Sequence, residues 1–268
     1  MKPVLLIAGA GYLGSEIARQ ATGYQVIPVT KSGGEGCEAC DLSSPQAVAD
    51  LAALIPPPEV VIHCASSGRG GPEAYRGVFL EGSRNLLHSF PESHLVLTSS
   101  TSVYHQTDGS EVDEDSPTEP IRETSQILLE AEQVILSGGG TVARLAGLYG
   151  PGRSVVLRKF LEGTAVIEED GRRILNQIHV EDAASAVLHL ARLKAPGIFN
   201  VSDSHPLSQL ECYQGLADHF DRPLPPTGEK NTSRKRAWTH KSVSNARILE
   251  TGWQPKYPRF FDALEHLI

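Results

Sequence analysis

The sequence predicts an α/β protein built on a doubly wound parallel sheet. Short apolar runs alternate with helix-like segments through the first two hundred residues, which is typical of consecutive βαβ units. The first apolar run leads directly into GAGYLG, where Gly9, Gly11 and Gly14 have the spacing of a dinucleotide-binding turn. Because this turn follows a strand and opens a helix, the predicted sheet is Rossmann-like.

The expected elements follow in order along the chain. VLLIA at 4–8 is a buried strand, after which Leu13, Ile17 and Ala21 recur at helical spacing. Further strands are expected at 25–29, weakly before Asp41, and at 60–64, 94–99, 141–145 and 197–201. Helices are expected at 45–54, 73–89, 124–137, 181–191 and 208–219. We predict a dinucleotide-binding domain at 1–150, completed by 177–201, and a small substrate-binding lobe at 151–176 and 202–268.

Composition excludes several classes of protein. The chain has 40% hydrophobic and 21% charged residues, as ordinary globular proteins do. Its net charge of −8 argues against binding nucleic acid through phosphates. No stretch is long enough to span a bilayer, and glycines interrupt the initial apolar run before a signal peptide is complete. We therefore expect a cytoplasmic protein with no membrane partner.

The cysteines do not form a metal-binding pattern. Cys37 and Cys40 make one close pair, whereas Cys64 and Cys212 are isolated in the sequence. A structural zinc site needs a second close pair of ligands. We expect reduced thiols and assign no metal.

The glycine-rich turn and the end of the second strand define the cofactor prediction. In GAGYLG the backbone of Gly11, Tyr12 and Leu13 is expected to approach a pyrophosphate at the start of a helix. The second strand ends in Thr30, Lys31 and Ser32 rather than in a carboxylate. A cation with hydroxyls suits the 2′-phosphate of NADP better than the ribose of NAD. The alternative is that Lys31 is only an exposed loop residue.

Further motifs carry a resemblance that runs almost end to end. They are CDLSS at 40–44, HCASSG at 63–68, LTSSTSVY at 97–104, RLAGLYGPGR at 144–153, NQIHVED at 176–182, FNVSD at 199–203 and SVSNARILETGWQPKYP at 242–258. With these motifs the chain resembles the extended short-chain dehydrogenase/reductase family, which includes nucleotide-sugar epimerases and dehydratases. The resemblance implies that Asp41 and Leu42 flank the adenine, Ala65 and Ser66 line the nicotinamide ribose, and the turn containing Gly147 approaches the carboxamide.

The resemblance breaks at the expected proton-transfer pair. It implies that Ser100, four residues before Tyr104, bonds the reacting oxygen, and that a Tyr-x-x-x-Lys helix supplies the proton. Counting back from Glu132 places that pair at Thr124 and Leu128, and neither residue can act as a proton donor. Thr101 and Ser102 occupy the positions where the dehydratases carry an Asp–Glu pair, so a 4,6-dehydratase is disfavoured.

Three residues are candidates to replace the missing tyrosine. Tyr104 is expected near the nicotinamide, with packing against the lobe as the alternative. His105 follows it, and His179 lies before a helix, where a structural hydrogen bond is the alternative role. We assign catalysis to Ser100 and Tyr104. Substrate contacts are assigned to Thr101, Tyr149, Arg153, Asn176, His179 and Arg234.

These assignments predict an NAD(P)-dependent oxidoreductase or epimerase. Its substrate is expected to be a small molecule, a sugar or a similar polar carbonyl compound, with sugar nucleotides as one option. The alternative is a non-catalytic NADP-binding sensor or assembly partner. Relatives often dimerise through the helices at 73–89 and 124–137, and Leu128, Leu129, Ile135 and Leu136 add apolar residues to the second helix. We therefore expect a homodimer.

Overall fold

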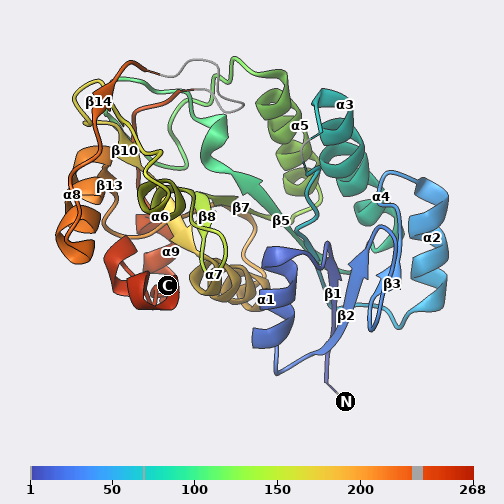
Figure 1. Cartoon of the computed structure of the whole chain (residues 1–268). Coiled ribbons are helices and arrows are strands. Elements are labelled where there is room, and N and C mark those ends of the chain that lie inside the picture. Colours follow the sequence, from blue (N-terminus) through green and yellow to red (C-terminus); the bar gives the residue numbers. More distant parts are fainter. Residues whose placement is uncertain (1, 69, 231–237) are drawn as a thin grey trace.

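The central sheet has the predicted parallel, doubly wound form. The computed structural model describes residues 2–68, 70–230 and 238–268. Within them, seven parallel strands form one sheet in the order β12-β7-β5-β4-β1-β2-β3 (Figure 1). These strands are β1 (Val4–Ala8), β2 (Gln25–Thr30), β3 (Glu38–Ala39), β4 (Val60–His63), β5 (His94–Ser100), β7 (Thr141–Leu145) and β12 (Gly197–Val201). The strand order reverses between β1 and β4, where ligands bind in folds of this kind.

Helices cover both faces of the sheet. On one face, α1 (Tyr12–Gln20) and α7 (Val180–Leu193) pack together over a core that includes Ile7, Ile17 and Val187. On the other face lie α2 (Pro45–Leu54), α4 (Gly82–Ser89) and α5 (Glu123–Ser137). The helix expected at 73–89 consists of α3 (Pro72–Tyr75), a π-helical turn (Arg76–Glu81) and α4. The two helical layers therefore bury strands that read as continuous apolar runs.

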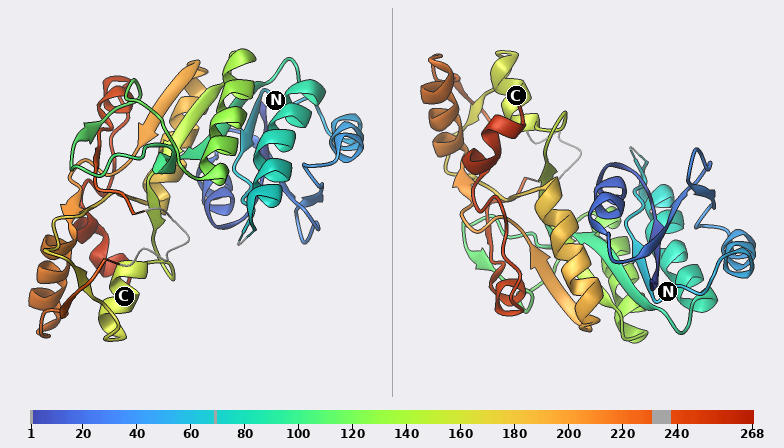
Figure 2. Two further views of the ribbon diagram at one scale, coloured as in Figure 1. Left: turned by 90° about the horizontal axis from the view of Figure 1, so that it is seen from above. Right: turned by 90° about the horizontal axis from the view of Figure 1, so that it is seen from below.

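Much of the chain after β7 forms a smaller lobe beside the sheet (Figure 2), and this lobe has a core of its own. Its elements are β8 (Gly147–Tyr149), α6 (Val155–Leu161), β9 (Ile167–Glu168), β10 (Ile174–Leu175), β11 (Gln177–His179), β13 (Leu207–Ser208), α8 (Gln209–Phe220), β14 (Thr227–Gly228) and a 3₁₀ helix (Phe260–His266). The helix α9 (Ala246–Glu250) instead contacts β12, and its Ile248 lies in the main core. Phe160, Cys212, Leu216 and Phe260 lie in the core of the smaller lobe. The helix α8 begins with a capping box in which Ser208 and Glu211 bond each other's backbone N–H.

Two short strand pairs join distant parts of the chain beside this core. The strand β10 pairs with β13 in antiparallel fashion, and β6 (Glu111–Val112) pairs with β15 (Ser242–Val243) in parallel fashion. The second pair brings the segment just before residue 242 next to the loop that follows β5. Residues that are more than a hundred positions apart in sequence are thereby neighbours in space.

The apolar residues behind the dimer expectation are not exposed. Leu128 and Ile135 of α5 are buried in the core, and Leu129 and Leu136 are half-buried against it. The helix α5 thus lacks the apolar surface that the sequence suggested. The homodimer stays a prediction that rests on the resemblance alone.

Among the helices within the described residues, none combines the length and the apolar character needed to cross a bilayer.

Candidate active site

A cleft of about 690 Å³ lies across the carboxyl ends of the sheet strands. Its walls include the loops after β1, β2, β4, β5 and β7, together with the start of α5. The smaller lobe closes it from the opposite side with Arg173, Asn176 and Lys241. The cleft is therefore placed at the switch point of the sheet, where the strand order predicts a ligand.

The glycine-rich turn has the shape of a pyrophosphate cradle. Gly9 adopts φ 117°, and a Cβ there would lie 2.2 Å from the Ala65 backbone nitrogen. A Cβ on Gly14 would lie 2.2 Å from the Gly9 oxygen, so Gly14 serves close packing and does not line the cleft. A Cβ on Gly11 would meet open space, and no side chain caps the start of α1. The backbone around Gly11, Tyr12 and Leu13 thus faces the cleft at a helix N-terminus and fits a dinucleotide.

At the adenosine end, the residues after β2 and β3 lie together. Lys31, Asp41 and Leu42 line the cleft, and Lys31 Nζ is 2.8 Å from Asp41 Oδ2. Thr30 also lines it, although its hydroxyl donates to the Gly33 carbonyl at 2.9 Å. Ser32 is exposed and lies outside the cleft lining. Lys31, which the sequence analysis assigned to a ribose phosphate, thus lines the cleft, and its ammonium has a carboxylate partner.

The opposite end of the cleft has the residues expected around a nicotinamide. Ala65 and Ser66 follow β4, and Gly147 opens β8, where its N–H donates to the Asn176 carbonyl at 3.1 Å. Ser100 ends β5 and Thr101 follows it; both line the cleft. The Ser100 hydroxyl accepts a hydrogen bond from the Ser102 N–H at 3.2 Å, which leaves its own proton available to a ligand. Ser100 thus presents a hydroxyl to the cleft, and its catalytic role stays a prediction.

The two residues that replace the proton-transfer pair also face this cleft. Thr124 and Leu128 lie one turn apart on α5 and both line it. The two positions counted back from Glu132 therefore share the helical face that borders the cleft. They present a hydroxyl and an isobutyl group to it, where the resemblance implies a phenol and an ammonium.

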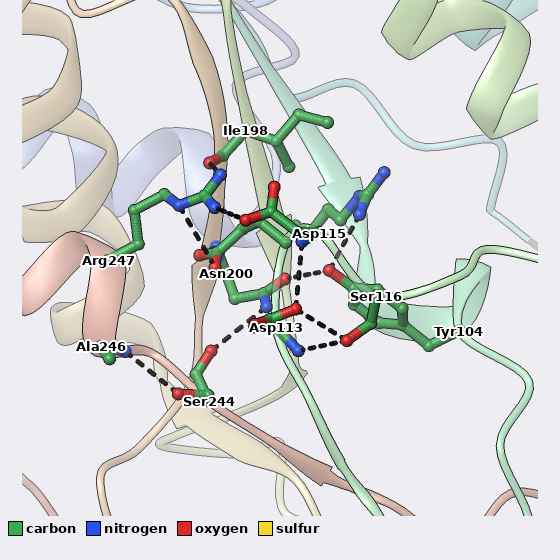
Figure 3. A network of polar contacts seen from close by, with 11 residues as sticks. Tyr104, Asp113, Asp115, Ser116, Ile198, Asn200, Ser244, Ala246 and Arg247 are labelled. Carbon is green, nitrogen blue, oxygen red and sulfur yellow. Dashed lines mark hydrogen bonds and ion pairs between the residues drawn. The ribbon is translucent and has the colours of Figure 1, made fainter.

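Tyr104 is not in the cleft, contrary to the expectation that it is the proton donor. Its side chain is 0% exposed, its hydroxyl donates to Asn200 Oδ1 at 2.9 Å, and it accepts from Arg144 Nη1 at 2.8 Å (Figure 3). Arg144 is itself held by Glu132 at 2.7 Å, with both side chains buried. Burial raises the pKa of the Tyr104 phenol, with the nearby Arg144 opposing it. Tyr104 therefore has a structural role, which was the alternative to its assignment as proton donor.

Tyr149 and His179 are likewise buried outside the cleft lining, so neither contacts a substrate there. His179 is the N-cap of α7, where its Nδ1 accepts from the Glu181 N–H at 3.3 Å. The ring of Tyr149 lies edge-on to that of His179, with centroids 5.3 Å apart. The structural role that was the alternative for His179 therefore applies to both residues.

The remaining substrate assignments divide into two that line the cleft and one that cannot be placed. Arg153 lies on the lining, with its guanidinium carbon 5.0 Å from the centre of the Tyr12 ring. Asn176 lines the cleft too, but its side chain bonds the Lys241 carbonyl and the Val243 N–H, both at 2.8 Å. Asn176 therefore positions the adjacent strand. Arg234 lies outside the described residues.

The sequence analysis missed two cations that the smaller lobe brings to the cleft. Arg173 and Lys241 both line it, and Lys241 is 4% exposed. The Lys241 ammonium donates to the Tyr104 carbonyl at 2.8 Å. Burial, reinforced by the charge of Arg173, lowers the pKa of Lys241 to about 8. Neither residue belongs to a recognisable local motif, so no pattern in the sequence indicated them.

Over residues 2–68, 70–230 and 238–268, no three His, Cys, Asp or Glu side chains gather in a way that could hold a metal ion. Cys37, Cys40, Cys64 and Cys212 are free thiols.

The sequence model of the NAD-dependent epimerase/dehydratase family matches residues 4–202, which include the glycine turn, Ser100 and the helix α5. The chain belongs to this family. This epimerase/dehydratase-family protein is 26% identical over 166 residues to a 3-diazoavenalumate denitrifying reductase from a Streptomyces species. The match covers 56% of this chain and 55% of that enzyme, so the chain spans about half the length of that relative.

Solved structures show the same fold over almost the whole length. An epimerase/dehydratase-type protein from Methylobacillus flagellatus is 28% identical, with a TM-score of 0.81 over 100% of this chain and 98% of its own. The human epimerase family protein SDR39U1, solved with NADPH, gives 21% identity and a TM-score of 0.80 over 99% and 98% of the two chains. MoeE5, solved with UDP-glucose and NAD, gives 20% and 0.79 over 98% and 96%. At these last two identities the likeness concerns the fold.

Proposed function

We propose that this epimerase/dehydratase-family protein is an NADP-dependent oxidoreductase that acts on a small polar carbonyl compound. The observation that carries the proposal is the position of Ser100. Its hydroxyl lies in the same cleft as the glycine turn, at the end bounded by Ala65 and Gly147. A dinucleotide laid on the turn and extending toward Gly147 ends beside this hydroxyl.

The residues of the cleft fit the parts of the cofactor. The backbone at Gly11 and Tyr12 suits the pyrophosphate, Leu42 the adenine and Lys31 the 2′-phosphate. When bound, the nicotinamide ring supplies or accepts a hydride. The preference for NADP over NAD rests on Lys31. It is supported by a structural relative that was solved with NADPH, although another was solved with NAD.

Two side chains of the protein, Ser100 and His105, supply the other groups that the reaction needs. Ser100 donates its hydroxyl to the reacting oxygen, which stabilises negative charge developing there. His105 supplies or removes the proton. Tyr104 and His179 are excluded from that role because they are buried outside the cleft lining, whereas His105 lines it. An imidazole has an ordinary pKa near the operating pH, which suits acid–base work.

The substrate class is chosen from the surroundings of Ser100. Polar side chains, with Thr101, Thr124 and Gln177 among them, line this end of the cleft. They suit a substrate with several hydroxyls, such as a sugar or a sugar nucleotide. MoeE5, which shares the fold, was solved with UDP-glucose, and the curated relative is named a reductase, so both substrate types belong in a screen.

A second candidate is a non-catalytic NADP-binding protein. The observation in its favour is that Thr124 and Leu128 line the cleft where a tyrosine and a lysine act in the family. On this hypothesis the cleft binds the dinucleotide and the chain reports its presence to another molecule. The intact Ser100 site favours the catalytic proposal.

A screen of substrates tests the two candidates against each other. NADPH absorbance is followed with a panel of polar aldehydes, ketones and sugar nucleotides, and sugar-nucleotide interconversion is followed by chromatography. Turnover that is lost in Ser100→Ala supports the oxidoreductase. Tight NADPH binding with no turnover across the panel would favour the non-catalytic candidate.

A further inference from the structure

The ammonium group of Lys241 is buried at the substrate end of the cleft. Its backbone is held by Asn176, which donates to the Lys241 carbonyl, and its Nζ donates to the Tyr104 carbonyl at 2.8 Å. Over the part of the chain that the structure describes, no Asp or Glu oxygen lies within 4.0 Å of this nitrogen. Lys241 is therefore a buried cation whose observed partner is a neutral backbone oxygen.

Some of the other buried ionisable side chains of this protein have a partner of opposite charge. Arg144 and Glu132 are 2.7 Å apart, and Glu114 lies 3.6 Å from Arg247. An ion removed from water without a partner is penalised by several kcal/mol, so proteins pair such groups or replace them. Lys241 has no such partner among the described residues, and it lines a cleft that is open to a ligand. An anionic group of a ligand can therefore act as its counter-ion.

The neighbourhood of Lys241 adds positive charge. Arg173 lines the same wall; its Nε donates to the Thr239 carbonyl at 3.2 Å and its Nη1 is 3.8 Å from Glu168. Among the described residues that line the cleft, the acidic side chain is Asp41, which lies at the adenosine end and is paired with Lys31. A chain with a net charge of −8 thus presents a cationic wall beside its catalytic end.

We propose that Lys241 and Arg173 form an anion-binding subsite that receives a carboxylate or phosphate group of the substrate. The inference rests on the proposed function, because it takes this end of the cleft as the substrate end. It deepens that function by requiring an anionic substrate. Carboxylate and phosphate oxygens are both strong acceptors from ammonium and guanidinium groups, so they share the chemistry that the subsite recognises.

Anion binding here is coupled to a proton. The charged side chain beside Lys241 is Arg173, which lines the same wall of the cleft. Its positive charge disfavours the ammonium form of Lys241, whereas an anion favours it. Binding should therefore weaken as pH rises through the pKa of Lys241, which lies at about 8.

The test is calorimetric titration with inorganic phosphate and with malonate, in the presence and absence of saturating NADPH. NADPH covers the phosphate sites near Gly11 and Lys31, so the remaining binding reports the proposed subsite. We expect Lys241→Met to weaken the binding of whichever anion the wild type binds more tightly by ~10-fold or more, because a charge-assisted contact is lost. Lys241→Arg, which keeps the charge, should lose much less affinity, and Lys194→Met, at an exposed lysine paired with Glu59, should match the wild type.

Each outcome decides the inference separately from the proposed function. Equal affinity in wild type and Lys241→Met, or no binding of either probe to wild type, overturns the subsite. If anion binding depends on Lys241 but no substrate is turned over, the subsite is supported and the proposed oxidoreductase activity is contradicted. If neutral substrates are turned over as fast as their carboxylated or phosphorylated counterparts, the subsite is contradicted and the oxidoreductase activity is supported. Thermal unfolding of every variant shows that a lost contact is not a lost fold.

Discussion

The ammonium group of Lys31 lies 2.8 Å from the carboxylate of Asp41 at the adenosine end of the cleft. The hydrogen bond from Lys31 is the main reason why the pKa of Asp41 falls to about 2, with a bond from Ser43 adding to it. Asp41 is therefore ionised at neutral pH and competes with any phosphate for Lys31. The carboxylate of Asp41 therefore limits how strongly Lys31 can select NADP over NAD.

The first prediction concerns this choice of cofactor. NADPH should bind more tightly than NADH. Lys31→Glu should lower the ratio of NADPH affinity to NADH affinity by ~10-fold or more, because a charge-assisted phosphate contact becomes a repulsion. Fluorescence titration of both cofactors measures the ratio. Lys2→Glu, the same charge change at an exposed lysine bonded to the Thr22 carbonyl, is the matched control. An unchanged ratio in Lys31→Glu would mean that Lys31 is only a surface residue.

The second prediction separates Ser100 from Thr124. Ser100→Ala should lower kcat by on the order of 10²-fold, as expected when a donor to a developing oxyanion is removed. Thr124→Ala should change kcat only slightly, since a threonine hydroxyl does not ionise near neutral pH. Both residues line the same cleft, so the pair controls for general damage to it. A larger loss in Thr124→Ala than in Ser100→Ala would contradict the assignment.

The third prediction assigns Tyr104 to stability. Tyr104→Phe keeps the ring but leaves Asn200 Oδ1 and Arg144 Nη1 without the hydroxyl that now joins them. Unfolding free energy should fall by roughly 1–3 kcal/mol, the effect of unsatisfied buried groups. Denaturant unfolding measures this fall, while kcat should stay within a few-fold of wild type. A large loss of kcat at unchanged stability would restore Tyr104 as a proton donor.

These positions show what the sequence could and could not predict. The strands were predictable because buried parallel strands are continuous apolar runs, and Thr124 was located by its spacing from Glu132 on one helix. The burial of Tyr104 depends on Arg144 and Asn200, which are 40 and 96 positions away. Lys241 reaches the cleft through the pairing of β15 with β6. Contacts between such distant segments leave no local periodicity to detect.

The fourth prediction tests His105 as the proton donor. His105→Phe should lower kcat and remove a titration from its pH profile, because an aromatic ring of similar shape then lacks an ionisable group. His88→Phe, on the helix α4 and outside the cleft lining, is the control. NADPH affinity should be unchanged in both variants. A pH profile in His105→Phe that overlays the wild-type profile would show that the proton comes from another group.

The last prediction uses the buried charge of Lys241. Because burial lowers its pKa from 10.5 to about 8, the unfolded chain binds more protons than the folded chain between these values. Stability therefore rises with pH in this window, the reverse of the behaviour of a lysine that gains a carboxylate partner. Relative to Lys241→Met, the wild type should gain on the order of 3 kcal/mol of unfolding free energy across it.

Denaturant unfolding of both proteins at several values of pH measures that difference, in which the titration of all other groups largely cancels. At neutral pH, Lys241→Met should be as stable as the wild type or more so, because replacing a buried charge by an apolar side chain of similar volume removes its desolvation penalty. Lys194→Met should show no trend of this kind, since Lys194 is exposed and ion-paired with Glu59. A pH-independent difference between wild type and Lys241→Met would mean that the ammonium is hydrated in solution. If Lys241→Met is more stable than the wild type but no longer binds anions, the charge at position 241 contributes to ligand binding and not to folding stability.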